Sequence, residues 1–301
     1  MSGPSLRRLF QLLASLPDDL VRIQKTLTYL REGLGRVEGR LDRLAPPTPG
    51  LAEHEFKVYS QWGEDGILQY LTRTVPIARR VFVEFGVENY TEANTRFLLV
   101  NDQWSGLIID GSEDHMNFVR RDDLYWRHNL KAVCSFVTRD NINDILRDHG
   151  LTGEIGLLSV DIDGNDYWVW ERIDVVNPAI VVVEYNARFG PERAVTTPYD
   201  PAFQRQQAHY SCIYYGASLA ALVGLGQRKG YAFVGSNRAA NNAFFVRRDL
   251  LPAGVPALTA AEGWRPCDFR ESRDASGQLA FLSPEQESAL LASLPLVEVE
   301  P

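Results

Sequence analysis

The sequence predicts an α/β fold of the doubly wound, Rossmann-like class, with a mostly parallel seven-stranded sheet, an antiparallel last strand and a preceding N-terminal coiled-coil helix. Apolar runs of four or five residues, bounded by glycine and polar residues, are typical of strands buried on both faces of a parallel sheet. Three such runs end on an acidic residue, at Glu84, Asp110 and Asp161. Helical patterns alternate with the runs, which indicates βαβ units.

The expected elements follow one another in βα order. Strands are expected near 81–86, 106–110, 131–136, 156–161 and 179–184, with a closing antiparallel pair at 231–234 and 243–246. Helices are expected near 63–74, 92–101, 113–122, 140–149, 166–173 and 218–229. Because ligands of such sheets bind outside the carboxyl ends of the strands, the three acids fall where a binding site is expected.

Composition argues against several classes of protein. The chain has 301 residues, of which 45% are hydrophobic and 23% charged, as in ordinary globular proteins. Its net charge of -8 argues against binding to the phosphate backbone of nucleic acid. The 3 cysteines are widely separated and form no CxxC motif, which indicates neither a disulfide framework nor a zinc site. We therefore expect a cytoplasmic protein. No transmembrane segment is expected, since Gln11 and Pro17 interrupt the first apolar stretch.

Residues 1–45 are predicted to form a helical, coiled-coil oligomerisation segment. Apolar residues recur there at alternating steps of three and four, the seam of a left-handed coiled coil. The seam consists of Leu13, Leu16, Leu20, Ile23, Leu27, Leu30, Leu34, Val37, Leu41 and Leu44. Leucine at every a position, with Ile23 and Val37 at d, shifts the preference from dimers to higher states. We therefore expect a homo-oligomer, with a trimer or tetramer favoured.

Two alternatives stay open for this segment. Pro17 just behind Ser15 is typical of a helix start, which would put residues 6–14 into a separate short helix. An amphipathic helix that lies on its own domain would also show such a seam. Residues 46–55, which begin with a proline-rich stretch, are predicted to be a linker, and residues 56–301 the main domain.

Several motifs of the main domain resemble those of FkbM-type class I methyltransferases. Residues 59–67, YSQWGEDGI, resemble the SQ-x-GED motif of that family, and residues 82–87, FVEFGV, resemble its first strand and the glycine after it. Asn94-Thr95, the stretch WSGLIID at 104–110 and the stretch SVDIDG at 159–164 resemble later motifs. The matches span roughly residues 56–185 and are independent of one another. The resemblance implies a methyltransferase whose donor is S-adenosylmethionine.

The donor site implied by the resemblance lies at the carboxyl ends of the first strands. Its expected residues are Gln61, Glu84, Gly86, Asp110, Gly111, Ser135, Phe136 and Asp161. Gly86 lacks a Cβ, so its backbone could approach the donor closely, although a tight-turn glycine is the alternative. Asp110 follows Glu84 at close to the ~20-residue offset of acids that bind ribose hydroxyls. A helix N-cap is the alternative for Asp110, and core packing is the alternative for Phe136.

An acceptor site is expected beside the donor, at the ends of the fourth and fifth strands. Asp163, Glu184 and His209 are the candidate catalytic residues, because a hydroxyl acceptor needs a base. Asn186, Tyr214 and Tyr215 are candidates for binding a sugar or glycan precursor, since aromatic faces with hydroxyl tips suit carbohydrates.

Carboxylates at this position leave the question of a metal open. Asp163 and Glu184 could bind a divalent metal such as Mg²⁺, whereas acids after the fourth strand could instead cap the following helix. Asp161 and Asp163 also form a D-x-D pattern, which makes a metal-dependent glycosyltransferase the runner-up. A non-catalytic oligomeric scaffold is the third hypothesis.

Overall fold

The computed structural model describes residues 6–46, 48 and 50–301, and of residues 6–15 it describes only the backbone. The chain divides into two units, one that ends at Ala45 and one that begins at Pro46. Each unit is described by itself.

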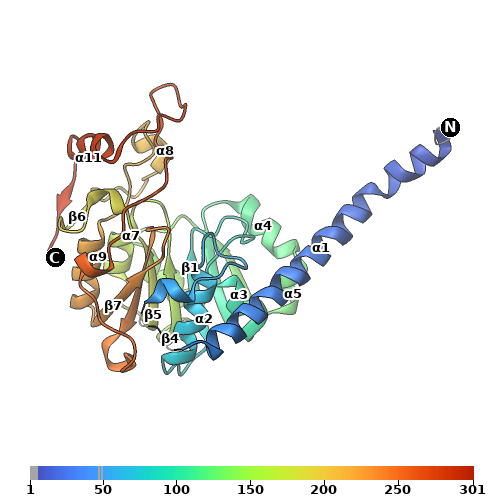
Figure 1. Cartoon of the computed structure of the whole chain (residues 1–301), viewed down its shortest axis with the longest axis horizontal. Coiled ribbons are helices and arrows are strands. Elements are labelled where there is room, and N and C mark those ends of the chain that lie inside the picture. The colour runs from blue at the N-terminus through green and yellow to red at the C-terminus, as the bar shows by residue number, and fades with distance from the viewer. Residues whose placement is uncertain (1–5, 47, 49) are drawn as a thin grey trace. The chain divides into compact units, whose positions relative to one another are not determined.

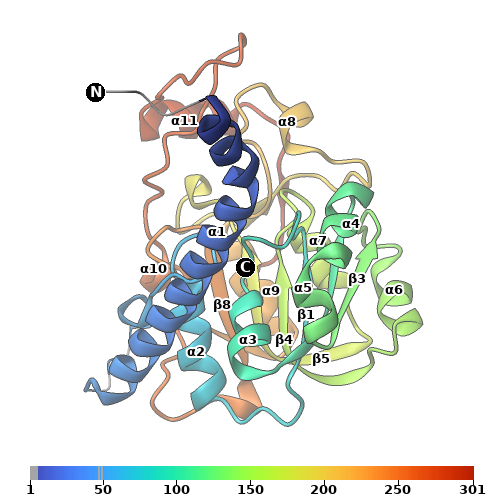
Figure 2. The same ribbon diagram turned by 90° about the vertical axis from the view of Figure 1, so that its right-hand side faces the viewer.

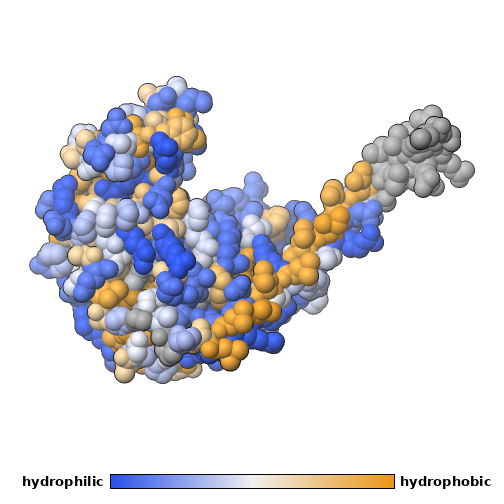
Figure 3. All heavy atoms as spheres, in the orientation of Figure 1, coloured by the Kyte–Doolittle hydropathy of each residue, from blue (hydrophilic) through white to orange (hydrophobic). Residues whose placement is uncertain are grey.

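In the first unit, the described residues form one helix, α1, which spans Leu6–Leu44. The expected break near Ser15 is wrong, because Pro17 lies inside the helix. A proline removes one backbone hydrogen bond, a loss that a helix of 39 residues tolerates. Every seam residue from position 16 onward is an exposed apolar side chain; these are Leu16, Leu20, Ile23, Leu27, Leu30, Leu34, Val37, Leu41 and Leu44. They account for much of the orange line along α1 in Figure 3, whereas the side chain of Leu13 lies outside the described residues.

The second unit is built on a seven-stranded sheet with the order β3-β2-β1-β4-β5-β8-β7 (Figure 1). The strands are β1 (Val81–Phe85), β2 (Ser105–Asp110), β3 (Leu130–Cys134), β4 (Gly153–Val160), β5 (Val176–Glu184), β7 (Tyr231–Ser236) and β8 (Asn242–Arg247). Strands β1 to β5 pair in parallel, while β8 runs antiparallel to both β5 and β7. The predicted doubly wound fold with an antiparallel last strand is therefore confirmed.

Helices cover both faces of this sheet (Figure 2). One face packs against α2 (Glu64–Thr74), α3 (Arg96–Asp102), α4 (Glu113–Arg121) and α5 (Asp123–Arg127). The other packs against α6 (Ile142–Asp148), α7 (Asp166–Arg172) and α9 (Leu219–Arg228). Successive strand residues alternate between the two cores: Phe82 and Ile108 lie in the first, Val83 and Leu107 in the second. Burial of both faces explains why the strands read as continuous apolar runs.

Smaller elements complete the second unit. They are η1 (Leu51–His54), η2 (Ala187–Phe189), β6 (Val195–Thr196), α8 (Arg205–Ala208), η3 (Arg248–Leu250), α10 (Ala260–Gly263), α11 (Pro284–Ala292) and β9 (Val297–Glu298). Within the predicted linker, η1 buries Leu51, Ala52 and His54. Ser283 and Gln286 form a capping box at the start of α11. In the described part of the chain, every helix is too short or too polar to cross a membrane.

Candidate functional site

The predicted acids meet at one edge of the sheet, because β2, β1 and β4 are neighbours. Glu84 of β1 is in register with Ile108 of β2 and Ser159 of β4. Asp110 ends β2, and Asp161 follows β4 directly. Parallel strands therefore bring the three carboxyl-terminal ends side by side.

Gly86 makes the closest contact between the first and fourth strand ends. Its φ angle is +67°, and its amide nitrogen donates a hydrogen bond to the Ile109 carbonyl at 3.0 Å. A Cβ at this position would overlap the carbonyl oxygen of Asp161. Both the left-handed backbone and the missing side chain thus require glycine. The sequence left open whether Gly86 serves a tight turn or a close approach of the backbone. In the structure Gly86 has both a turn conformation and a close contact, with the Asp161 carbonyl.

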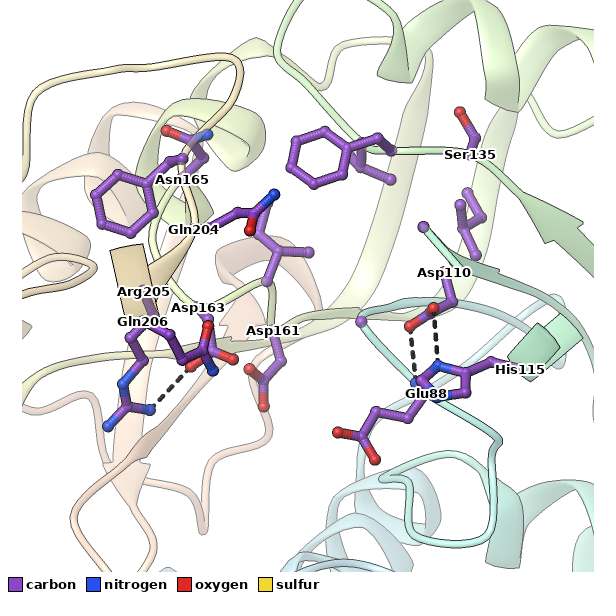
Figure 4. A pocket seen from close by; sticks show the side chains of 17 residues that line it. Glu88, Asp110, His115, Ser135, Asp161, Asp163, Asn165, Gln204, Arg205 and Gln206 are labelled. Carbon is purple, nitrogen blue, oxygen red and sulfur yellow. Dashed lines mark hydrogen bonds and ion pairs between the residues drawn. The ribbon is translucent and has the colours of Figure 1, made fainter. Parts of the chain in front are cut away.

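A cavity of about 480 Å³ opens beside Gly86 (Figure 4). Six of the eight predicted donor-binding residues line it: Gly86, Asp110, Gly111, Ser135, Phe136 and Asp161. A second cavity of about 240 Å³ is lined by the other two, Gln61 and Glu84. Gly86 and Asp161 line both cavities, so the two spaces adjoin where β1 and β4 end. We call them the first and the second cavity.

Asp110 is held in position by three groups. Its Oδ2 accepts a hydrogen bond from the Glu88 amide at 2.8 Å, and its Oδ1 accepts one from the Ser112 amide at 2.8 Å. The Nδ1 of His115 lies 3.2 Å from the same Oδ1 (Figure 4). The Ser112 side chain, rather than Asp110, caps α4 by accepting a hydrogen bond from the His115 amide. The N-cap alternative for Asp110 is therefore wrong.

Phe136 supplies an apolar surface to the first cavity. It follows the end of β3 and is 48% exposed, so core packing does not explain it. A half-exposed ring in a cavity wall could pack against a flat heteroaromatic group. Ser135, whose amide donates a hydrogen bond to the Asp110 carbonyl at 2.9 Å, ties this wall to the β2 end.

The carboxylate of Glu84 is occupied by hydrogen bonds within the chain, so its role differs from the predicted one of binding S-adenosylmethionine. One oxygen accepts hydrogen bonds from the Asn94 amide and the Ser159 hydroxyl, and the other accepts bonds from the Thr95 amide and hydroxyl. These contacts attach the Asn94-Thr95 motif to the sheet. Burial raises the pKa of Glu84 to about 6, although the four donors oppose the shift.

The SQ-x-GED motif also forms a buried network. The Oδ2 of Asp65 accepts bonds from the amides of residues 58–60 and from the Ser60 hydroxyl. The Oε1 of Glu64 accepts bonds from Nδ2 of Asn237 at 2.6 Å and of Asn242 at 3.1 Å. Glu64 thus links the motif to β8. Gln61 of the same motif lies in the wall of the second cavity.

Acidic groups dominate the second cavity. One carboxylate oxygen from each of Asp161, Asp166 and Glu184 lies within 4.8 Å of the other two. Asp161 and Glu184 line this cavity, whereas Asp166 lies outside its wall. Burial first, and then the charges of neighbouring acids, raise the pKa of both Asp161 and Glu184 well above the usual range. Asp166 also accepts hydrogen bonds from the Ile162 and Gly164 amides at 2.8 and 2.9 Å, so it closes the turn after β4.

Asp163 lies outside that group of three carboxylates and pairs with Arg205 instead. Its φ is +55°, and its Oδ1 accepts a hydrogen bond from Nη1 of Arg205 at 2.9 Å (Figure 4). The guanidinium of Arg205 also contacts Glu271 at 2.8 Å and lies 3.8 Å above the ring of Tyr215. Arg205 lines both cavities. Sequence reasoning missed it, and its only signal was a position inside the polar aromatic stretch after β5.

Four predicted residues do not reach the two cavities. The described walls of the first and second cavity do not contain His209, Asn186, Tyr214 or Tyr215. His209 bonds to the Ser211 hydroxyl at 2.7 Å, and the buried Asn186 amide donates to the Ile213 and Tyr215 carbonyls. These side chains hold the segment 187–215 together. Tyr214 donates to the Pro295 carbonyl at 2.5 Å, and the buried Tyr215 supports Arg205.

The walls of the first cavity also contain residues that sequence reasoning did not select. They include Glu88, His115, Asn165, Gln204 and Gln206. Glu88 and His115 follow the first two strands closely, so their position after a strand end was an available signal. Phe203 and Gln204 come from a segment that lies far away in sequence, and no local pattern places it there.

No protein-family model and no curated protein matches the sequence. Among solved structures, the chain is similar to the N-terminal domain of EvdMO1 with SAH bound, with a TM-score of 0.40 and 13% identity over 70% of this chain and 94% of that one. A SAM-dependent methyltransferase from Aquifex aeolicus matches with a TM-score of 0.34 and 10% identity over 69% and 96%. Human N-acetylserotonin methyltransferase in complex with SAM matches with a TM-score of 0.33 and 11% identity over 61% and 53%.

Proposed function

We propose that this chain is a methyltransferase of the FkbM type that transfers the methyl group of S-adenosylmethionine to a hydroxyl of a sugar or glycan precursor. The observation that carries the proposal is the pair of adjoining cavities, which meet at Gly86 and Asp161. One has the groups that a nucleoside needs, and the other is lined by acids and amides.

The first cavity suits the donor. Its volume of about 480 Å³ lies in the range of small-molecule sites. Asp110 would accept a hydrogen bond from the ribose hydroxyls through Oδ2, which accepts one described bond, from the Glu88 amide, and has a second lone pair. Phe136 would pack against the adenine ring. The backbone at Gly86 would lie against the methionine portion of the donor.

The second cavity suits a hydroxyl-bearing acceptor. Gln61, Asn94 and Asn242 offer amide groups, and Asp163 and Glu184 offer carboxylates. An acceptor oxygen would attack the methyl carbon in line with the breaking carbon–sulfur bond, which leaves S-adenosylhomocysteine. The proton of the hydroxyl passes to a carboxylate of this cavity, as a poor nucleophile requires. His209 lies outside the wall, so Asp163 and Glu184 are the proposed bases.

The N-terminal segment adds an architectural proposal. We propose that α1 associates with α1 of other copies through its exposed seam, as a trimer or tetramer. The regular spacing of nine exposed apolar side chains on this helix supports the proposal.

Isothermal titration calorimetry of the full chain tests the donor. We expect saturable binding of S-adenosylhomocysteine, and no comparable binding of UDP or GDP sugars. Binding of a nucleotide sugar alone would favour the glycosyltransferase hypothesis, and absence of both would favour the scaffold. Methyl transfer from labelled S-adenosylmethionine to a panel of neutral monosaccharides then tests the acceptor class.

A further inference from the structure

Three carboxylates converge at the second cavity: Asp161 and Glu184 line its wall, and Asp166 adjoins them outside it. Asp161 follows β4, Asp166 begins α7 and Glu184 ends β5, so three separate elements bring these acids together. One oxygen from each of the three lies within 4.8 Å of the other two. Carboxylates this close repel one another unless a proton or a cation lies between them.

Two acceptor atoms in the same wall have no hydrogen-bond partner among the residues that the structure describes. Oε2 of Glu184 and Oδ1 of Asn242 are buried without one, and the two residues are only 7% and 3% exposed. Glu184 and Asn242 are directly opposite each other in the β5–β8 pair, so their side chains share a face. Both line the second cavity. Buried acceptors are nearly always paired, so these two oxygens indicate that a ligand with positive charge or donors is bound there.

The charge of Arg205 lowers the pKa of Asp161 and Glu184, but its described hydrogen bonds go to other groups. Its Nε donates to the Cys212 carbonyl at 2.7 Å, its Nη1 to Asp163 and its Nη2 to Glu271. The described hydrogen bonds of its guanidinium therefore go to groups outside the three carboxylates. The Nδ2 of Asn242 likewise donates its hydrogen bond to Glu64. The amide oxygen of Asn242 is therefore the atom that is left as an acceptor for the cavity.

We propose that Asp161, Asp166 and Glu184 bind one divalent cation of the Mg²⁺ or Mn²⁺ type, with Asn242 as a further oxygen in its surroundings. Oxygen-only ligand sets suit these hard cations. The set differs from the predicted pair of Asp163 and Glu184, because Asp163 turns toward Arg205. The proposal deepens the proposed function, since a bound cation would lower the pKa of an acceptor hydroxyl that reached it. Asp163 would then be the carboxylate that accepts the proton.

Mn²⁺ binding without donor or acceptor tests the site. The full chain is stripped with EDTA, desalted and titrated with MnCl₂, while the free Mn²⁺ signal is followed by electron paramagnetic resonance. We expect one Mn²⁺ per chain, displaced by excess Mg²⁺. Glu184→Gln and Asp161→Asn should each weaken binding by at least about tenfold, because each removes a charged ligand. Glu92→Gln, an exposed acid of the same cavity wall, is the matched control and should bind like the wild type.

Each outcome decides the proposal. Absence of Mn²⁺ binding to the wild type overturns it, as does unchanged binding in both Glu184→Gln and Asp161→Asn. Circular dichroism of each variant shows whether it is folded, and two independent variants keep the test valid if one is not. S-adenosylhomocysteine binding is measured in parallel on the same samples. Mn²⁺ binding without S-adenosylhomocysteine binding would retain the cation site and reject the methyltransferase.

Discussion

Arg205 and Asp163 form an ion pair of 2.9 Å that joins the segment 187–215 to the turn after β4. Both residues line the two cavities, so the pair lies where donor and acceptor would meet. The Arg205 side chain is only 14% exposed, whereas that of Asp163 is 50% exposed.

Arg205→Gln is expected to weaken S-adenosylhomocysteine binding by roughly tenfold, because the segment that carries Phe203 and Gln204 loses its attachment. Calorimetry measures the affinity, and stopped-flow measures a faster dissociation. Arg193→Gln is the control. Arg193 lies in the same segment and forms an exposed ion pair with Glu298, so its loss should change neither the affinity nor the dissociation rate. Equal affinities in the wild type and Arg205→Gln would show that this ion pair does not shape the donor site.

Gly86→Ala is expected to lower the free energy of unfolding by more than a left-handed backbone angle alone explains. The matched control is Gly150→Ala, since Gly150 has a φ of +74° and open space around its Cβ position. We expect a loss of about 1 kcal/mol at Gly150 and several times that at Gly86, where the Cβ overlaps the Asp161 carbonyl. Urea unfolding measures both. Similar losses at the two positions would contradict the close approach of the β1 and β4 ends.

Asp110→Ala is expected to weaken donor binding by ~1 to 3 kcal/mol, because it removes a charged hydrogen-bond acceptor from the first cavity. Calorimetry with S-adenosylhomocysteine gives the number. Asp114→Ala, at an exposed acid in the first turn of α4, should leave the affinity unchanged. If Asp110→Ala binds as tightly as the wild type, Asp110 does not contact the ribose.

Leu27→Asp is expected to dissociate the proposed homo-oligomer, because a charge at an a position of the seam would be buried between helices. Light scattering after size-exclusion chromatography measures the mass. Thr28→Asp adds the same charge one residue along, outside the seam, and should retain the wild-type mass. A monomeric wild type would reject the coiled-coil proposal, and the helix would then need another partner for its seam.

Asp65→Asn is expected to be better tolerated at pH 7.5 than at pH 5. Burial raises the pKa of Asp65 from 3.8 to about 6 in the folded chain, so between these values the folded state holds a proton that the unfolded state has lost. Stability from this group therefore falls as pH rises through that window, by at most about 3 kcal/mol. The variant lacks the ionisation, so its free energy of unfolding relative to wild type should increase from pH 5 to pH 7.5. Urea unfolding at the two pH values checks the sign, and a decrease would contradict it.

The sequence by itself determined the layered fold and most of the first cavity. Apolar runs mark strands that are buried on both faces, and acids at their ends must share one edge when the strands are parallel neighbours. Gly86 and Asp110 could be selected on that basis alone. The seam of α1 was equally readable, because a heptad repeat is a local property of the sequence.

Only the tertiary structure decided which polar groups face one another. Spacing could not distinguish Asp166 from Asp163, because the turn after β4 has a positive φ at Asp163 and directs that side chain toward Arg205. Nor could it place His209 outside both cavities or bring Asn242 opposite Glu184. Periodicity records which faces are buried. The partner of a polar side chain depends instead on loops and on strand order, which bring together residues that are far apart in the sequence.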